Sequence, residues 1–240
     1  MQHFTPHLYQ QAAIDAIIDK PSVGLWMEMG LGKTVVTLTA IDTLIYDAAE
    51  IRRVLVVAPK KVAEATWQDE AQKWDHLQHL RISTVLGTEA QRIAALNTPA
   101  DVYIINRENC YWLVGYYGRH WPFDMVVLDE ASSFKNHAAQ RFKALKAVRP
   151  KIAKVVELTG TPAPNNPLDL WAQIYLLDQG ERLGKYVTHY RQAYFWPTEY
   201  SWEAKDGAGD AIRRKISDLV LSFKAADLLE LPEKIVEDVP

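Results

Sequence analysis

Short apolar runs alternate along most of the chain with longer stretches in which apolar and polar residues recur at helical spacing. The apolar runs are short enough to be buried strands, and they cover residues 23–26, 54–58, 82–86, 102–105, 125–128 and 155–158. The helical stretches include residues 35–46 and 63–74, and in the second of these Trp67, Ala71 and Trp74 lie on one face. We expect these tryptophans in the core, because burial requires such one-sided spacing. The alternation predicts a parallel sheet covered by helices on both faces.

The pattern changes after Leu177. A stretch rich in Tyr, Trp, Lys and Glu covers residues 180–206, and Gly-Ala-Gly at residues 207–209 interrupts it. A helical pattern follows over residues 211–229, and we expect a helix there.

These patterns predict an α/β fold: a parallel sheet flanked by helices, followed by a small C-terminal helical subdomain. We place the sheet-containing lobe at residues 1–178 and the subdomain at residues 179–240. Tyr190, Tyr194 and Trp196 of the subdomain could stack on nucleic-acid bases, but aromatic packing of a small helical module is the favoured interpretation.

The composition is that of an ordinary soluble protein, with 48% hydrophobic and 24% charged residues in a chain of 240. Cys110 is the single cysteine, so no internal disulfide is possible, which fits a reducing cytoplasm. No apolar stretch reaches the length of a membrane span, and the polar start is not a secretory signal. We expect a soluble, cytoplasmic monomer.

The net charge of −3 argues against a generally basic surface, so any contact with nucleic acid would be local.

The first candidate for chemistry is Met-Glu-Met-Gly-Leu-Gly-Lys-Thr at residues 27–34, between an apolar run and a helical stretch. Two glycines allow backbone N–H groups to surround a phosphate, and the N-terminal end of the following helix adds positive charge. Lys33 would reach the β- and γ-phosphates, and the Thr34 hydroxyl would bind Mg²⁺. The usual pattern has glycine at the position of Met27, and a glycine-rich turn without a ligand is the alternative. The expected nucleotide-binding residues are Glu28, Met29, Gly30, Leu31, Gly32, Lys33, Thr34 and Val35.

A second candidate is the pair Asp129-Glu130, which ends the apolar run at residues 125–128. The carboxyl ends of parallel strands are where ligands bind, so both carboxylates would face the crevice that holds the phosphate loop. Asp129 can hold Mg²⁺ directly or through water, and Glu130 can polarise the attacking water. The alternative is a solvated acidic pair at a strand end.

Together these motifs resemble those of superfamily-two helicases, and the rest of the chain resembles the SWI/SNF (sucrose-nonfermenting) branch of DNA translocases in its phage and bacterial form. Further stretches carry the resemblance: Leu8-Tyr9-Gln10, Val57-Ala58-Pro59 with Trp67 and Trp74, Asp129-Glu130-Ala131-Ser132 with Phe134-Lys135-Asn136, and Leu158-Thr159-Gly160-Thr161-Pro162 with Asn165-Asn166 and Leu170-Trp171. A weaker match covers residues 226–234. Ser132 departs from the family, which usually has His there.

The resemblance implies a motor of two RecA-like lobes that holds ATP between them and moves along duplex DNA. This chain would be the amino-terminal lobe, and the second lobe, with its catalytic arginine, would be missing from it. The isolated chain should therefore be nearly inactive in hydrolysis.

Gln10 is expected to select ATP, because an amide can donate to and accept from the N6/N7 edge of adenine at once. Thr159, Gly160 and Thr161 lie at the end of a strand, where they would sense the γ-phosphate. A surface glutamine and an ordinary Gly-Thr-Pro turn are the alternatives.

Lys60 and Lys61 lie at a strand end where the family contacts DNA phosphates. Lys135 and the pair Arg213–Arg214 are further candidates for nucleic-acid contacts, with a solvated surface charge as the alternative for each.

The expected function is that of the Mg-ATP-binding lobe of a DNA-stimulated ATPase and translocase, with Lys33, Asp129 and Glu130 as its catalytic residues. Two alternatives stay open: a lobe of an RNA helicase, and a nucleotide-gated nucleic-acid-binding module without turnover.

Overall fold

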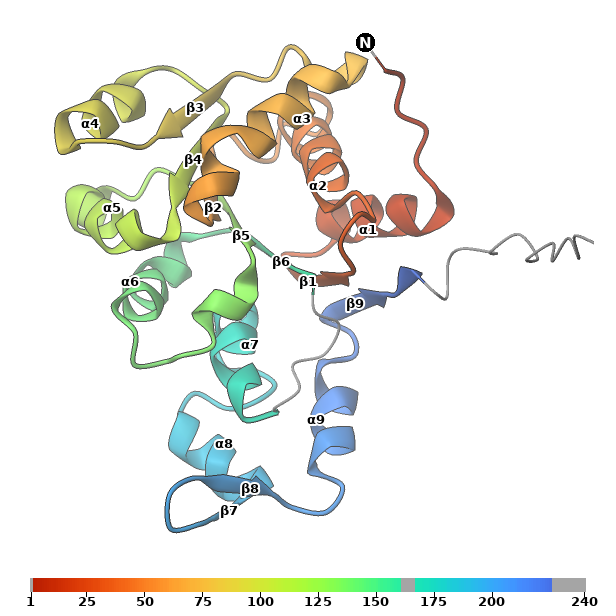
Figure 1. Cartoon of the computed structure of the whole chain (residues 1–240), viewed down its shortest axis with the longest axis vertical. Helices are drawn as coiled ribbons and strands as arrows, with labels where there is room; N and C mark the ends of the chain where they lie inside the picture. The colour runs from red at the N-terminus through yellow and green to blue at the C-terminus, as the bar shows by residue number, and fades with distance from the viewer. Residues whose placement is uncertain (1, 161–166, 226–240) are drawn as a thin grey trace, which may run out of the picture.

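The strands of the main sheet all run parallel, in the order β3-β4-β2-β5-β6-β1-β9 (Figure 1). This computed structural model of the 240-residue chain describes residues 2–160 and 167–225. The strands are β1 (Ser22–Met27), β2 (Val54–Ala58), β3 (Ile82–Val85), β4 (Val102–Asn106), β5 (Met125–Asp129), β6 (Lys154–Thr159) and β9 (Val220–Phe223). Each apolar run of the sequence is a strand, so the predicted parallel sheet is confirmed.

Helices cover both faces of this sheet (Figure 1). One layer consists of α1 (Leu8–Asp19), α2 (Lys33–Asp42) and α3 (Trp67–Lys73), and the other of α5 (Cys110–Tyr117), α6 (Gln140–Val148) and α7 (Leu170–Asp178), with α4 (Glu89–Asn97) packed against β3. Short 3₁₀ or π-helical turns connect the elements: η1 (Thr43–Asp47), η2 (Val62–Thr66), η3 (Asp75–Leu77), η4 (Arg107–Asn109), η5 (Gly118–His120), η6 (Ala131–Phe134), η7 (Arg149–Lys151) and η8 (Pro167–Asp169).

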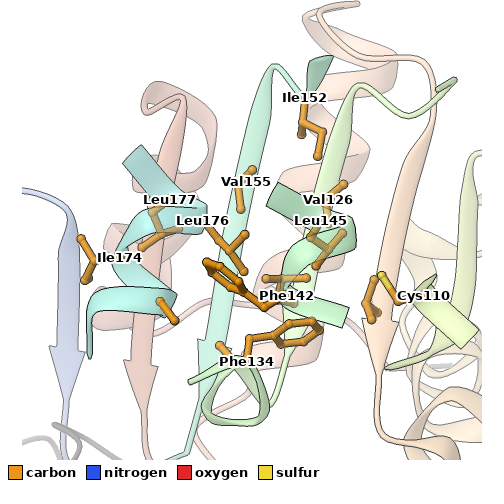
Figure 2. Close-up of a cluster of buried hydrophobic side chains, with 14 of the residues drawn as sticks. Cys110, Val126, Phe134, Phe142, Leu145, Ile152, Val155, Ile174, Leu176 and Leu177 are labelled. Carbon is orange, nitrogen blue, oxygen red and sulfur yellow. The ribbon is translucent and has the colours of Figure 1, made fainter. Parts of the chain in front are cut away.

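The strands read as continuous apolar runs because both of their faces are buried. Neighbouring residues of a strand serve opposite layers: Val126 packs in the layer of α6 and α7, whereas Val127 packs in the layer of α1 to α3. Figure 2 shows part of the first of these layers, which contains Phe142 and Leu145 of α6 together with Val126 of β5. Because both faces of each strand are buried, the register between neighbouring strands is fixed. The carboxyl ends of the parallel strands, which carry the polar motifs, therefore lie together at one edge of the sheet.

The expected core position of the tryptophans in residues 63–74 is confirmed for Trp67, which is fully buried together with Ala71. These residues lie on α3, which continues from the π-helical turn η2. Trp74 follows the helix as its C-cap and is only half-buried, with its ring centroid 5.2 Å from that of Phe4.

After α7 the chain forms α8 (Val187–Tyr194), an antiparallel hairpin of β7 (Phe195–Pro197) and β8 (Trp202–Ala204), and α9 (Ala208–Ile216) (Figure 1). The chain then returns to the sheet as β9 beside β1. The expectation of one helix over residues 211–229 is wrong, because α9 ends at Ile216. Residues 219–223 pair instead with β1, whose backbone groups would otherwise lack partners on that side. Residues 226–229 lie outside the described part of the chain, and the division at residue 178 stays a prediction.

The aromatic residues of this region pack mainly on one another. Tyr190 is 1% exposed, and its ring lies 5.3 Å from that of Tyr194 and 5.5 Å from that of Phe195. This confirms the packing interpretation for Tyr190 and Tyr194, whereas Trp196 is 61% exposed.

In the ranges that the structure describes, no helix is long and apolar enough to cross a membrane.

Candidate nucleotide-binding site

The predicted phosphate loop joins β1 to α2 at the carboxyl edge of the sheet. The helix begins at Lys33, as expected, and no side chain caps its N-terminus at Gly32. Gly30 and Gly32 have φ angles of 85° and 82°, in the left-handed region that favours glycine. A Cβ atom on Gly32 would lie 2.6 Å from Gln10 Nε2, so a side chain there would collide with a buried neighbour. The two glycines therefore give the loop its shape, and the uncapped helix end suits an anion.

Met27, the departure from the usual loop pattern, is the last residue of β1 and is fully buried. At this position the backbone is still part of the sheet, so an apolar side chain fits and no glycine is needed. Only its carbonyl takes part in the loop, because it accepts a hydrogen bond from Lys33 Nζ at 2.9 Å.

Lys33 lies between the loop and the acidic pair. Its Nζ donates to the carbonyls of Met27 and Glu28, at 2.9 and 3.2 Å. Burial lowers the pKa of the ammonium, while the charges of Glu130 and Asp129 act to raise it. The ammonium is thus held at the loop by weak carbonyl acceptors, which phosphate oxygens would replace with stronger, charge-assisted bonds.

The acidic pair follows β5 as predicted. Asp129 is the last residue of the strand, and Glu130 takes a φ of 55°, a left-handed conformation that is uncommon outside glycine. Such strain is often found at functional sites. Burial raises the pKa of Asp129, whereas a hydrogen bond from the indole of Trp67 acts to lower it.

Gly160 brings the end of β6 to the same place. A Cβ atom on this residue would lie 3.7 Å from Glu130 Oε1 and 3.8 Å from Lys33 Nζ. The loop, the acidic pair and the β6 end therefore meet at one point of the crevice. Thr159 is buried at the end of β6. Thr161, with Pro162, Asn165 and Asn166 of the resemblance, lies outside the described residues.

A cavity of about 580 Å³ lies beside the loop, which is in the size range of ligand pockets. The phosphate loop, the segment before α1 and the end of α3 line it, through Gly30, Gly32, Lys33, Thr34, Val35, His3, Phe4, Thr5, His7, Gln10, Glu70, Lys73 and Trp74. No motif in the sequence indicates the contribution from Phe4, Glu70 or Lys73. Their place in the cavity wall depends on a long-range bridge that joins the start of the chain to the end of α3. In this bridge Gln2 N donates to Lys73 O at 3.0 Å, and Asp75 N donates to Gln2 O at 3.1 Å.

Gln10 lies on α1 next to the phosphate loop and is buried. Its Oε1 accepts from the N–H of His7 at 2.9 Å, and its Nε2 donates to the carbonyl of Leu31 at 3.2 Å. Both ends of the amide thus tie the start of α1 to the loop. Its expected role toward adenine stays a prediction.

The remaining loop residues differ in exposure. Leu31 and Val35 are buried, Thr34 is half-buried, and Met29 is 86% exposed. The carboxylate of Glu28 accepts a hydrogen bond from the N–H of Ala225 at 2.9 Å, which links the loop to the segment after β9.

Residues 9–236 match the sequence profile of the SNF2-related domain. The chain belongs to the SNF2-related family. It is 38% identical to "Putative protein p41" of Acyrthosiphon pisum secondary endosymbiont phage 1, over 98% of this chain and 54% of that protein. It is 28% identical to "DNA excision repair protein ERCC-6-like" of Mus musculus, over 82% of this chain and 16% of that protein. The chain thus spans about half the length of the phage relative and less of the other.

A solved structure confirms the fold of this SNF2-related chain. The "Sulfolobus solfataricus SWI2/SNF2 ATPase core in complex with dsDNA" superposes with a TM-score of 0.72 at 23% identity, over 93% of this chain and 47% of that one. Together with the match to the SNF2-related domain, this likeness confirms the recognition of a SWI/SNF-type, RecA-like lobe from the sequence.

The lysines expected to contact nucleic acid lie on the SNF2-related lobe near the carboxyl ends of strands. Lys60 and Lys61 follow β2 and are exposed, and Lys60 Nζ lies 3.9 Å from Glu64 Oε1. Lys135 follows η6 and pairs with Asp169 at 3.2 Å. Arg213 and Arg214 are exposed on α9, away from this edge of the sheet. No contact distinguishes these side chains from other surface charges, so their role stays a prediction.

Proposed function

We propose that this chain is the ATP-binding motor lobe of a DNA-dependent ATPase and translocase. One observation carries the proposal. Lys33 Nζ and Glu130 Oε1 both lie within 4 Å of the position that a Cβ atom on Gly160 would take, beside a cavity large enough for a nucleotide. Backbone N–H groups of the loop and the ammonium of Lys33 would bind the phosphates. Glu130 would hold the attacking water and accept its proton.

The residues present also suit a magnesium ion. In the described part of the chain no group of three or more His, Cys, Asp or Glu side chains could hold a metal. Magnesium is usually bound through one or two carboxylates, with substrate phosphates and water completing its shell, so Asp129 and Thr34 are an adequate set of protein ligands. When bound, the ion would neutralise charge on the phosphates during transfer.

Hydrolysis should need more than this lobe. The catalytic arginine implied by the family resemblance comes from a second lobe, which would close over the crevice and complete the site. DNA would act by promoting that closure. An RNA helicase lobe and a binding module without turnover are distinguished from this proposal by measuring hydrolysis by a version extended through a second lobe, with duplex DNA, with RNA and with neither.

Calorimetry of ADP binding in Mg²⁺ tests the nucleotide site. We expect Lys33→Ala to weaken binding by at least about 100-fold, because hydrogen bonds to charged groups contribute about 1.5–3 kcal/mol each and the ammonium would make more than one. Lys151→Ala is the matched control, since it removes the same charge from a turn that precedes β6 at the opposite edge of the sheet. Equal affinity in wild type and Lys33→Ala would refute the assignment.

Binding of duplex DNA by this lobe should be weak, independent of sequence and steep in salt, because phosphate contacts from a few lysines are all that it offers. Replacing Lys60 and Lys61 by Ala should lower the affinity and reduce the slope of log K against log salt by about 0.9 for each DNA phosphate that is no longer neutralised. The control is Lys20→Ala with Lys151→Ala, at the opposite edge of the sheet. Titrations of labelled duplex at several salt concentrations measure both quantities, and identical slopes in the two double variants would exclude Lys60 and Lys61 from DNA contact.

A further inference from the structure

Trp67 is in direct contact with the acidic motif, although 62 residues separate it from Asp129. It is the first residue of α3 and is fully buried in the layer that also contains α1 and α2. Its indole Nε1 donates to Asp129 Oδ2 at 3.0 Å. A side chain whose helical spacing predicts a core position thus reaches the site through its one polar atom.

Indoles in the described part of the chain use both kinds of acceptor, carboxylates and backbone carbonyls. Trp74 donates to Glu70 Oε1 at 2.7 Å and Trp112 to Glu89 Oε1 at 3.2 Å. Trp67 differs from these two in being fully buried.

A buried indole N–H needs an acceptor, but a backbone carbonyl satisfies that need elsewhere in the chain. Trp171, which is 3% exposed, donates its Nε1 to the carbonyl of Gly184 at 2.9 Å. Trp67 instead binds a carboxylate that is itself partly buried and lies next to the second acid of the pair.

The indole has properties that suit this carboxylate. It is a donor only and carries no charge, so it stabilises the anion without repelling a cation. A carboxylate offers about four lone-pair positions, and the indole occupies one of them. Asp129 therefore keeps acceptor capacity for an ion or its water, while Oδ2 is held in place. A lysine at the position of Trp67 would give a stronger bond to Oδ2 but would compete with a dication for the same negative charge.

We propose that Trp67 is a positioning residue of the nucleotide site, whose indole N–H orients Asp129 toward the magnesium ion of a bound Mg-nucleotide. This inference rests on the proposed function, since it assumes that Asp129 binds the ion. Groups that hold metal ligands in this way change metal affinity by about 10-fold to 100-fold when they are removed. The effect should appear in the contribution of magnesium to nucleotide binding and not in the contacts that the phosphate loop makes alone.

The test is calorimetry of ADP binding to the 240-residue chain in Mg²⁺ and in EDTA. The ratio of the two affinities measures how strongly the ion supports binding. In Trp67→Phe we expect this ratio to fall by about 10-fold or more, with the affinity in EDTA unchanged. Trp171→Phe is the matched control, because it removes a buried indole N–H whose acceptor is a carbonyl, and its ratio should equal that of the wild type.

A second variant separates the N–H from the volume of the ring. Benzothienylalanine at position 67 replaces the N–H by sulfur and keeps the bicyclic shape, so it also serves if Trp67→Phe fails to fold. A reduced ratio in this variant supports the proposal. A wild-type ratio in a folded variant at position 67, or an equal fall in Trp171→Phe, would overturn it. If the wild-type chain binds no ADP in either condition, the proposed function fails first and this inference fails with it.

Discussion

The 240-residue chain should hydrolyse ATP at least about a thousandfold more slowly than a version extended through a second lobe. The lobe has the predicted phosphate loop and the carboxylates of Asp129 and Glu130, but the catalytic arginine is proposed to come from the other lobe. In related motors such an arginine contributes about 10³–10⁵ in rate, or roughly 4–7 kcal/mol of transition-state stabilisation. Steady-state release of phosphate by both versions, with and without duplex DNA, measures the difference.

DNA should stimulate only the two-lobe version, because its proposed effect is to close one lobe on the other. A Lys33→Ala variant of the two-lobe version is the control, and its loss of activity would assign the measured hydrolysis to this site. Robust DNA-stimulated turnover by the 240-residue chain would show that a complete site forms without the second lobe, and would contradict the account.

Glu130→Gln should retain nucleotide binding and lose most hydrolysis in the two-lobe version. The amide has the shape of the carboxylate but cannot accept the proton of the attacking water, and loss of a general base costs about 10²–10⁴ in rate. The left-handed φ of 55° should persist, because Glu and Gln bear the same steric cost there. Removing a negative charge beside the phosphates should leave the affinity for ADP equal or slightly higher.

Single-turnover hydrolysis and calorimetry on the same protein separate the two effects of this substitution. Glu203→Gln, on the exposed strand β8, removes a carboxylate far from the crevice and should leave both measurements unchanged. Hydrolysis by Glu130→Gln at the wild-type rate would exclude Glu130 as the base.

The fold was predictable where a local pattern determines the structure. The run Val54–Ala58 is a buried strand with the predicted bounds, because five consecutive apolar residues with covered faces have few alternatives. The helix start at Lys33 was equally predictable, since glycines precede it and a helical pattern follows. Strand β9 was missed because a four-residue, mainly apolar segment after a helix does not reveal its partner, which lies almost 200 residues earlier in β1.

The candidate site shows the same division between local and long-range information. The loop at residues 28–32 and the acidic pair were visible as motifs, and the structure brings both to Gly160. The bridge from Gln2 to Trp74 and the bond from Trp67 to Asp129 were not visible, because each joins segments that only the completed sheet places together. Trp67 was expected in the core from its helical spacing, which is correct, but spacing does not tell where an indole N–H points.

The most direct measurement of the central claim is hydrogen–deuterium exchange of the wild-type chain with and without Mg-ADP, with Lys33→Ala measured in parallel. If phosphates bind the backbone N–H groups of the loop, exchange should slow over residues 28–36 and at Asp129 and Glu130, and this protection should disappear in Lys33→Ala. Protection confined to another region, such as residues 187–216, or protection that is equal in both proteins, would contradict the assignment of the nucleotide site.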